Sequence, residues 1–117
     1  MQLTKDGQLQ PYASGFRSPN GIAFDPQGRL FVTDNQGDWV GTSTLYHVER
    51  GKHYGHIASL VWKEGWNRDL TTIPVASFDS MRTKAAVLFP HNIMADSPTQ
   101  PLFIPDSIDF GPLADNY

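Results

Sequence analysis

Residues 17–38 hold the side chains of this sequence that are best suited to chemistry. The guanidinium of Arg17 can bind a carboxylate through two parallel hydrogen bonds. The carboxylates of Asp34 and Asp38 are oxygen ligands of the kind that hard cations prefer. The same residue types also have structural uses, because an arginine can bind a neighbouring carbonyl and an aspartate often caps a turn. Both interpretations stay open at this point.

The histidines and tryptophans form a second group of candidates. Three of the four histidines lie within ten residues of one another: His47, His53 and His56. Imidazoles bind zinc and copper, but this spacing matches no helical metal-binding motif, so histidines scattered over a surface are the default interpretation. The tryptophans could stack on a sugar ring or pack between sheets: Trp39, Trp62 and Trp66.

The composition limits the classes of protein to consider. The chain has 117 residues, 9 basic and 12 acidic side chains, a net charge of −3 and no cysteine. A nucleic-acid-binding protein would need a concentration of Lys and Arg that is absent here. The lack of cysteine excludes disulfides, thiolate zinc sites, iron–sulfur clusters and an attached c-type haem in this segment. No apolar run is long enough to cross a membrane, and the sequence does not indicate a compartment.

The elements that must position these residues are predicted most clearly in residues 13–55. Residues 21–25 and 29–34 read as two strands joined by the turn Asp-Pro-Gln-Gly, in which Pro26 presets φ and Gly28 closes the turn. Phe31 is apolar and lies on the face opposite to Leu30 and Val32. A hairpin with apolar side chains on both faces is expected to be covered on both sides.

Shorter elements follow this hairpin. Residues 35–41 read as a polar loop, 44–49 as a third strand, and 50–52 as a turn into 53–55. Further along, 60–67 could hold a helical turn or a loop, 71–75 is predicted to be extended, 84–90 a strand, and 96–117 mostly loop. Three or four consecutive antiparallel strands within about 40 residues are typical of one propeller blade.

The sequence therefore predicts an all-β fold, a partial β-propeller of about two blades of antiparallel strands with long loops. Residues 1–117 are interpreted as a single incomplete propeller segment, and residues 13–55 as its best-defined blade. Propellers close with about 4–8 blades, and a chain of this length holds about two and a half at most. We expect the chain to be part of a longer protein, and a small closed sandwich is the alternative.

Residues 18–34 resemble the NHL-type blade repeat, which runs Pro-x-Gly-Ile-Ala-x-Asp-x-x-Gly-x-Leu-x-Val-Thr-Asp. Residues 15–24 and 33–38 are similar to the soluble quinoprotein glucose and sorbosone dehydrogenases, which are six-bladed propellers. Residues 45–56, 86–91 and 110–112 look like a bacterial branch fused to haem-carrying modules. This resemblance implies pyrroloquinoline quinone and calcium as cofactors, a sugar or polyol substrate, the rest of the propeller and a c-type haem module as partners, and a periplasmic or membrane-associated location.

The resemblance also assigns site residues. Arg17 matches the arginine that binds the carboxylates of the quinone, and Ser18 stands where the family has asparagine. Gln36 is expected to contact the cofactor, whereas Gly37 and Asp38 fall in the loop that binds calcium, with Asp38 in place of proline. The general base of the family, a histidine, lies on an earlier blade, so catalytic residues stay unassigned and we expect the chain alone to be inactive.

Two other function classes remain open. A metal-dependent lactonase of the gluconolactonase type is also a six-bladed propeller, and Asn20 matches its asparagine metal ligand. A non-catalytic NHL-like module that binds a partner through its rim is the second alternative. Bound quinone absorbance, lactone hydrolysis, or neither would distinguish the three.

Overall fold

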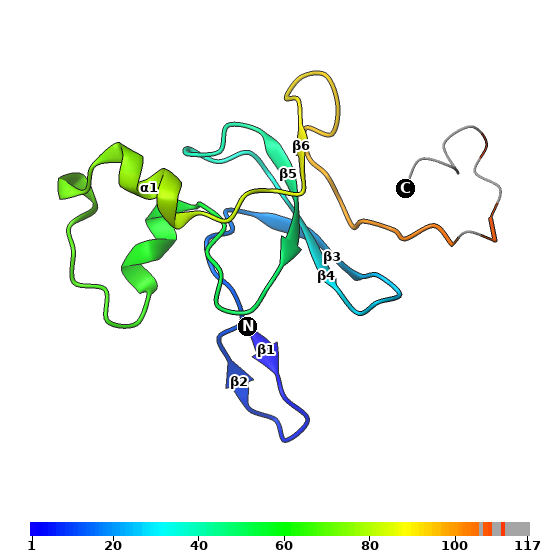
Figure 1. Cartoon of the computed structure of the whole chain (residues 1–117), viewed down its shortest axis with the longest axis horizontal. Coiled ribbons are helices and arrows are strands. Elements are labelled where there is room, and N and C mark those ends of the chain that lie inside the picture. The colour runs from blue at the N-terminus through cyan, green and yellow to red at the C-terminus, as the bar shows by residue number, and fades with distance from the viewer. Residues whose placement is uncertain (106, 109–110, 112–117) are drawn as a thin grey trace.

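A computed structural model describes residues 1–105, 107, 108 and 111 (Figure 1). Its centre is a four-stranded antiparallel sheet in the order β3-β4-β5-β6. These strands are β3 (Pro19–Phe24), β4 (Leu30–Asp34), β5 (Ser43–Val48) and β6 (Val87–Phe89). A separate hairpin of β1 (Gln2–Leu3) and β2 (Leu9–Gln10) projects from the sheet, and it was not predicted. The described part is mostly strand and loop with few helices, which confirms the predicted all-β, propeller-like class.

The predicted hairpin is confirmed. β3 and β4 pair with Ile22 opposite Val32 and Phe24 opposite Leu30. The amide of Gly28 donates to the carbonyl of Asp25 at 2.9 Å, and Gly28 has a φ of +77°, a conformation that side chains disfavour. The Asp25 carboxylate accepts the amides of Gln27 and Arg29 and so completes the turn.

The fourth strand of the sheet comes from later in the chain than the 13–55 segment. β6 pairs with β5, with Val87 opposite Leu45, so the strand expected in residues 84–90 is confirmed. Residues 53–55 add no strand to this sheet, because His53 forms only an isolated parallel bridge with Ser14. The 13–55 segment therefore supplies three of the four strands.

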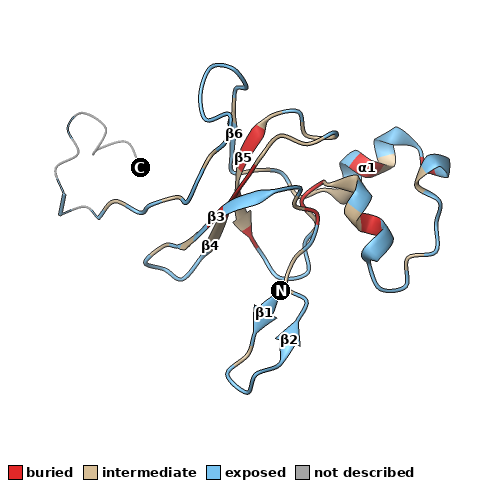
Figure 2. Ribbon diagram, turned by 180° about the vertical axis from the view of Figure 1, so that it is seen from behind, coloured by how far each residue is buried: buried red, intermediate tan, exposed pale blue. Residues whose placement is uncertain are grey.

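One face of the sheet, which we call the tyrosine face, is only partly covered. The strands present these side chains on it: Ile22, Phe24, Leu30, Val32, Tyr46 and Val48. Val32, Tyr46 and Val48 are buried beneath residues 12–16 and Tyr54, whereas Ile22 is 58% exposed and Phe24 65% exposed. The ribbon of β3 is accordingly mostly pale blue in Figure 2. The expectation of cover on this side is met over β4 and β5 and not over β3.

The chain itself covers the opposite face with residues 96–104, which we call the strap. The hydroxyl of Thr33 donates to the carbonyl of Thr99 at 2.7 Å, and the hydroxyl of Ser43 donates to the carbonyl of Asp96 at 3.0 Å. A Cβ on Gly21 would lie 2.4 Å from the Cα of Gln100, so only glycine lets the strap pass this closely. No helix or strand forms in the strap, as predicted for this region.

A small helical lobe, residues 57–81, packs beside the sheet (Figure 1). It holds two 3₁₀ helices, η1 (Ile57–Trp62) and η2 (Leu70–Thr72), and one α-helix, α1 (Val75–Met81). Leu60, Ile73 and Phe78 form its buried core. The prediction of an extended 71–75 was wrong: Asp69 caps η2 by accepting the Thr71 amide at 2.9 Å, and Val75 begins α1. In the described residues, no helix is long and apolar enough to cross a bilayer.

Tyr54 joins the sheet to the segments that cover its tyrosine face. Its hydroxyl donates to the carbonyl of His47 at 2.9 Å and accepts the amide of Glu49 at 2.8 Å. Its ring stacks on Phe16 at 5.0 Å and meets Tyr46 edge-on at 4.8 Å. Burial raises the pKa of Tyr54, so the neutral hydroxyl is the form that the fold keeps.

We expect Tyr54→Phe to lower the free energy of unfolding by about 1–3 kcal/mol, because the variant leaves the His47 carbonyl and the Glu49 amide without a partner. Urea denaturation followed by circular dichroism measures this change. Tyr12→Phe is the matched control, since the half-buried Tyr12 hydroxyl has no hydrogen bond among the described residues. Equal losses in both variants would contradict the role of the Tyr54 hydroxyl.

Candidate functional site

The predicted site residues gather at one end of the sheet, where β3 begins and β4 ends. Arg17, Ser18 and Asn20 lie on the chain entering and starting β3, and residues 36–38 lie in the loop after β4. The amide nitrogen of Asn20 lies 3.5 Å from the side-chain oxygen of Asn35, at the start of that loop. The structure thus brings together the two segments that the sequence assigned to one site.

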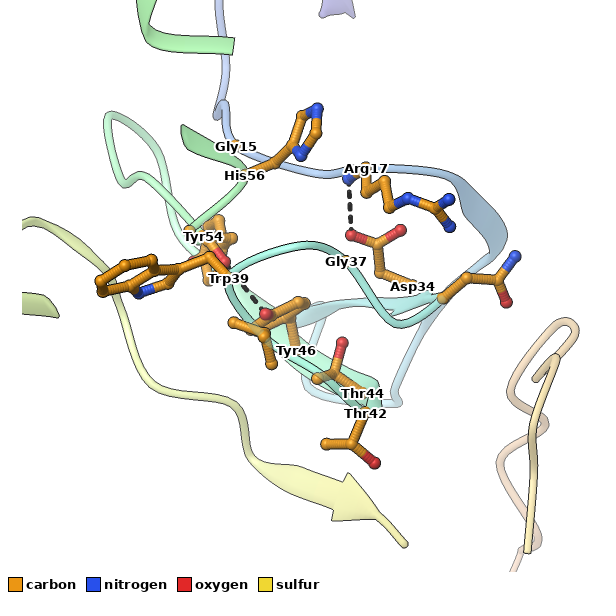
Figure 3. A pocket seen from close by; sticks show the side chains of 13 residues that line it. Gly15, Arg17, Asp34, Gly37, Trp39, Thr42, Thr44, Tyr46, Tyr54 and His56 are labelled. Carbon is orange, nitrogen blue, oxygen red and sulfur yellow. Dashed lines mark hydrogen bonds between the residues drawn. The ribbon is translucent and has the colours of Figure 1, made fainter. Parts of the chain in front are cut away.

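Asp34 holds these two segments in place. Its buried carboxylate accepts the amide of Arg17 at 2.8 Å, as Figure 3 shows. It also accepts the amide of Ser18 at 2.7 Å. A carboxylate that bonds backbone N–H groups in a buried place makes charge-assisted hydrogen bonds, which are the stronger kind. Asp34 is therefore a structural acceptor, and both of its oxygens are already used.

The loop after β4 turns tightly against Arg17. The Gly37 amide donates to the Val40 carbonyl at 2.7 Å, which closes a turn. A Cβ on Gly37 would lie 3.3 Å from the Cδ of Arg17, so the loop and the arginine stem are in close contact. The side-chain oxygen of Gln36 lies 3.5 Å from the Ser43 hydroxyl, whereas Asp38 is exposed.

The pocket beneath these residues is small. It measures about 10 Å³ and is lined by Arg17, Asp34, Gly37 and Thr44 among others (Figure 3). The hydroxyl of Thr44 is buried there without a hydrogen-bond partner in the described residues. This volume suits about one water molecule and excludes a quinone or a sugar ring. A larger ligand would have to contact Arg17 and Ser18 from their exposed side.

The histidines take separate positions. His47 lies against the ring of Phe31 at 5.3 Å, and Nδ1 of His53 lies 3.2 Å from the Ser14 hydroxyl. Within the described ranges, no group of three or more His, Cys, Asp or Glu side chains could hold a metal ion. A metal at the predicted place would need the oxygens of Gly37, Asp38 and Asn20, including backbone carbonyls.

Two of the tryptophans, Trp39 and Trp66, pack against the core of the helical lobe. Trp39 packs edge-on against Phe78 at 5.6 Å, and the indole of Trp66 donates to the Arg68 carbonyl at 2.7 Å. Trp62 is 87% exposed. Trp39 is therefore a packing residue, but its partner is the helical lobe and not a second sheet.

A family model for the NHL repeat matches residues 16–37, which span β3, β4 and the start of the loop that carries Gly37. This segment therefore has the sequence pattern of an NHL repeat. Such repeats form blades of β-propellers, in agreement with the antiparallel sheet. Comparisons with curated proteins and with solved structures give no significant match.

The NHL match supports the propeller blade and not the narrower resemblance to quinoprotein dehydrogenases. Of the stretches that carry that resemblance, residues 110 and 112 lie outside the described residues. Within the repeat, the resemblance assigned Arg17 to the quinone and Gly37 to the calcium loop, but the sequence indicated no partner for Asp34. The position of Asp34 at the end of a strand, next to a polar loop, was the feature of the sequence that could have indicated this role.

We expect Asp34→Asn to destabilise the chain by about 2 kcal/mol, because an amide cannot accept both backbone N–H groups and loses the charge that strengthens them. Asp38→Asn is the matched control, since the exposed Asp38 side chain has no hydrogen bond or ion pair among the described residues, and it should change stability by less than about 0.5 kcal/mol. Chemical denaturation measures both. Similar stability of the two variants would show that Asp34 does not hold the segment entering β3 against the end of β4.

Proposed function

We propose that this chain is part of a β-propeller that oxidises a hydroxyl of a sugar or polyol with pyrroloquinoline quinone, and that its Arg17 end faces the cofactor. One observation carries the proposal: Arg17 is exposed and its guanidinium has no ion pair among the described residues, while its backbone is fixed by Asp34. An arginine held in this way is prepared to bind a carboxylate of a ligand.

The residues fit the quinone as a carboxylate-bearing ligand. The Arg17 guanidinium would pair with one carboxylate, and the exposed Ser18 hydroxyl offers a second donor beside it. Calcium would rest against the Asp38 carboxylate and the Gly37 carbonyl, which are oxygen ligands of the required type. When bound, the quinone takes two electrons and two protons as the hydroxyl-bearing carbon becomes a carbonyl. This chain would orient the cofactor and balance its charge.

The uncovered part of the tyrosine face supports the assembly of a larger propeller. Ile22 and Phe24 border an open groove of about 530 Å³ that also touches Tyr12 and Phe16. Adjacent blades pack face to face around an axis, so an apolar blade face is expected to be covered by the next blade. We infer that the remaining blades supply this cover, together with the catalytic base that the chain does not provide.

The test is a titration of the chain with pyrroloquinoline quinone in the presence of calcium, followed by tryptophan fluorescence and quinone absorbance. We expect saturable binding without turnover, and Arg17→Ala should weaken it roughly tenfold or more because a charged hydrogen bond is lost. Arg68→Ala, an exposed arginine in the helical lobe, should leave the affinity unchanged. Absence of saturable binding, or equal effects of the two substitutions, would contradict the proposal.

The lactonase alternative is favoured by the position of Asn20. Its amide nitrogen donates to the Ser97 hydroxyl at 3.3 Å, while its side-chain oxygen accepts no hydrogen bond from a described residue and could bind a divalent cation. Metal-dependent hydrolysis of a lactone that is lost in Asn20→Ala would support this function. If neither the quinone nor a lactone is used, the non-catalytic NHL-like module that binds a partner through its rim is the better interpretation.

A further inference from the structure

A second concave surface, which we call the basic groove, lies between the sheet and the helical lobe. It measures about 480 Å³ and is formed by residues 51–53, by Leu60, Lys63 and Trp66, and by residues 80–83. The Thr83 amide donates to the His53 carbonyl at 2.7 Å and fixes two of its walls to each other. Its volume lies within the range of small-molecule sites, and it shares no lining residue with the cavity beneath Arg17.

The charges that line the basic groove have one sign. Lys52, Lys63 and Arg82 line it, and no carboxylate does. Arg82 pairs with Asp79 at 2.6 Å, whereas Lys52 and Lys63 have no ion pair among the described residues. Two ammonium groups are therefore uncompensated on a chain whose net charge is −3. A cleft lined by charge of one sign raises the local concentration of ions of the other sign.

His53 lies in the electrostatic field of the positive charges that line the basic groove. Burial, together with the charges of Lys63 and His56, lowers the pKa of His53. The carboxylate of Asp79, in the helix that precedes Arg82, is engaged by the Arg82 guanidinium. An anion placed among Lys52, Lys63 and His53 would relieve the repulsion that the imidazolium meets there.

We propose that the basic groove binds a small organic phosphate. Lys52 and Lys63 would contact the phosphate, and the hydroxyl of Thr83, which has no hydrogen bond among the described residues, would donate to it. Trp66 and Met81 are half-buried and give the rest of the ligand an apolar wall. A nucleic acid is the less favoured ligand, because few cations gather here and the remainder of the chain is acidic.

The test is a titration of the chain with inorganic phosphate, followed by amide chemical shifts in NMR spectra. We expect saturable shifts confined to residues 51–53, 63–66 and 80–83. The variant Lys52→Ala/Lys63→Ala should lose roughly tenfold or more in affinity. Lys5→Ala, an exposed lysine in the turn between β1 and β2, removes the same type of charge at a distant place and should bind as the parent does.

A second readout separates the groove from general ion effects. Saturating sulfate, whose charge is constant over the titration range of histidine, should raise the pKa of His53 in the parent and not in the double-lysine variant. Dispersed shifts, equal losses in the lysine variants, or no saturation would overturn the proposal. Saturable binding of a short single-stranded oligonucleotide but not of phosphate would overturn it in favour of a nucleic-acid site.

Discussion

The buried carboxylate of Asp34 is the constraint on which one end of the sheet depends, where β3 begins and β4 ends. A buried charge needs hydrogen-bond partners, and Asp34 finds them in the amides of Arg17 and Ser18, which belong to the segment entering β3. The pairing of β3 with β4 shifts register between Pro19 and Gly21, immediately after these amides. We interpret this irregularity as the adjustment that lets residues 17 and 18 reach the carboxylate while β3 still pairs with β4 in regular register from Gly21 onwards.

The two faces of the sheet solve the problem of cover in different ways. On one face the strap is held mainly through its own backbone carbonyls, by the hydroxyls of Thr33 and Ser43, and through the close approach at Gly21. These contacts require small or hydroxyl-bearing side chains on the sheet. They place little restriction on the side chains of the strap, because the strap contributes backbone carbonyls. On the tyrosine face Tyr46 and Tyr54 are buried, while Ile22 and Phe24 stay in contact with water. Leaving two large apolar side chains exposed costs free energy, which is why we infer a packing partner there.

The features that could be predicted from the sequence are those that depend on residues close together along the chain. The turn at residues 25–28 and the alternation of Ile22, Phe24, Leu30 and Val32 define the hairpin and its register, because their physical causes act within a few residues. β5 also pairs with β6, which lies some forty residues further along the chain. Only the packing of the whole sheet selects this second partner. The helix α1 has seven residues, too few for a hydrophobic period to appear.

The two segments that carry the candidate site residues were predictable from the sequence, but the contacts between them were not. A strand-end aspartate was visible in the sequence, but its acceptance of two backbone amides from an earlier segment follows from tertiary geometry. The basic groove was hidden for a related reason. Lys52, Lys63 and Arg82 are spread over three segments and dispersed among acidic residues, so neither the net charge nor any short window indicated them.

Gly15 links the two regions for which we propose ligands. It has a φ of +87°, and a Cβ there would lie 2.6 Å from the His53 ring and from the Tyr54 amide nitrogen. The amide of Tyr54 donates to the Ser14 carbonyl at 2.9 Å, and that of His56 donates to the Gly15 carbonyl at 2.8 Å. The segment that presents Arg17 is therefore fixed by Asp34 on one side and by residues 53–56 on the other. Because residues 52 and 53 also line the basic groove, one short backbone pairing positions both surfaces, and a side chain at position 15 would displace them together.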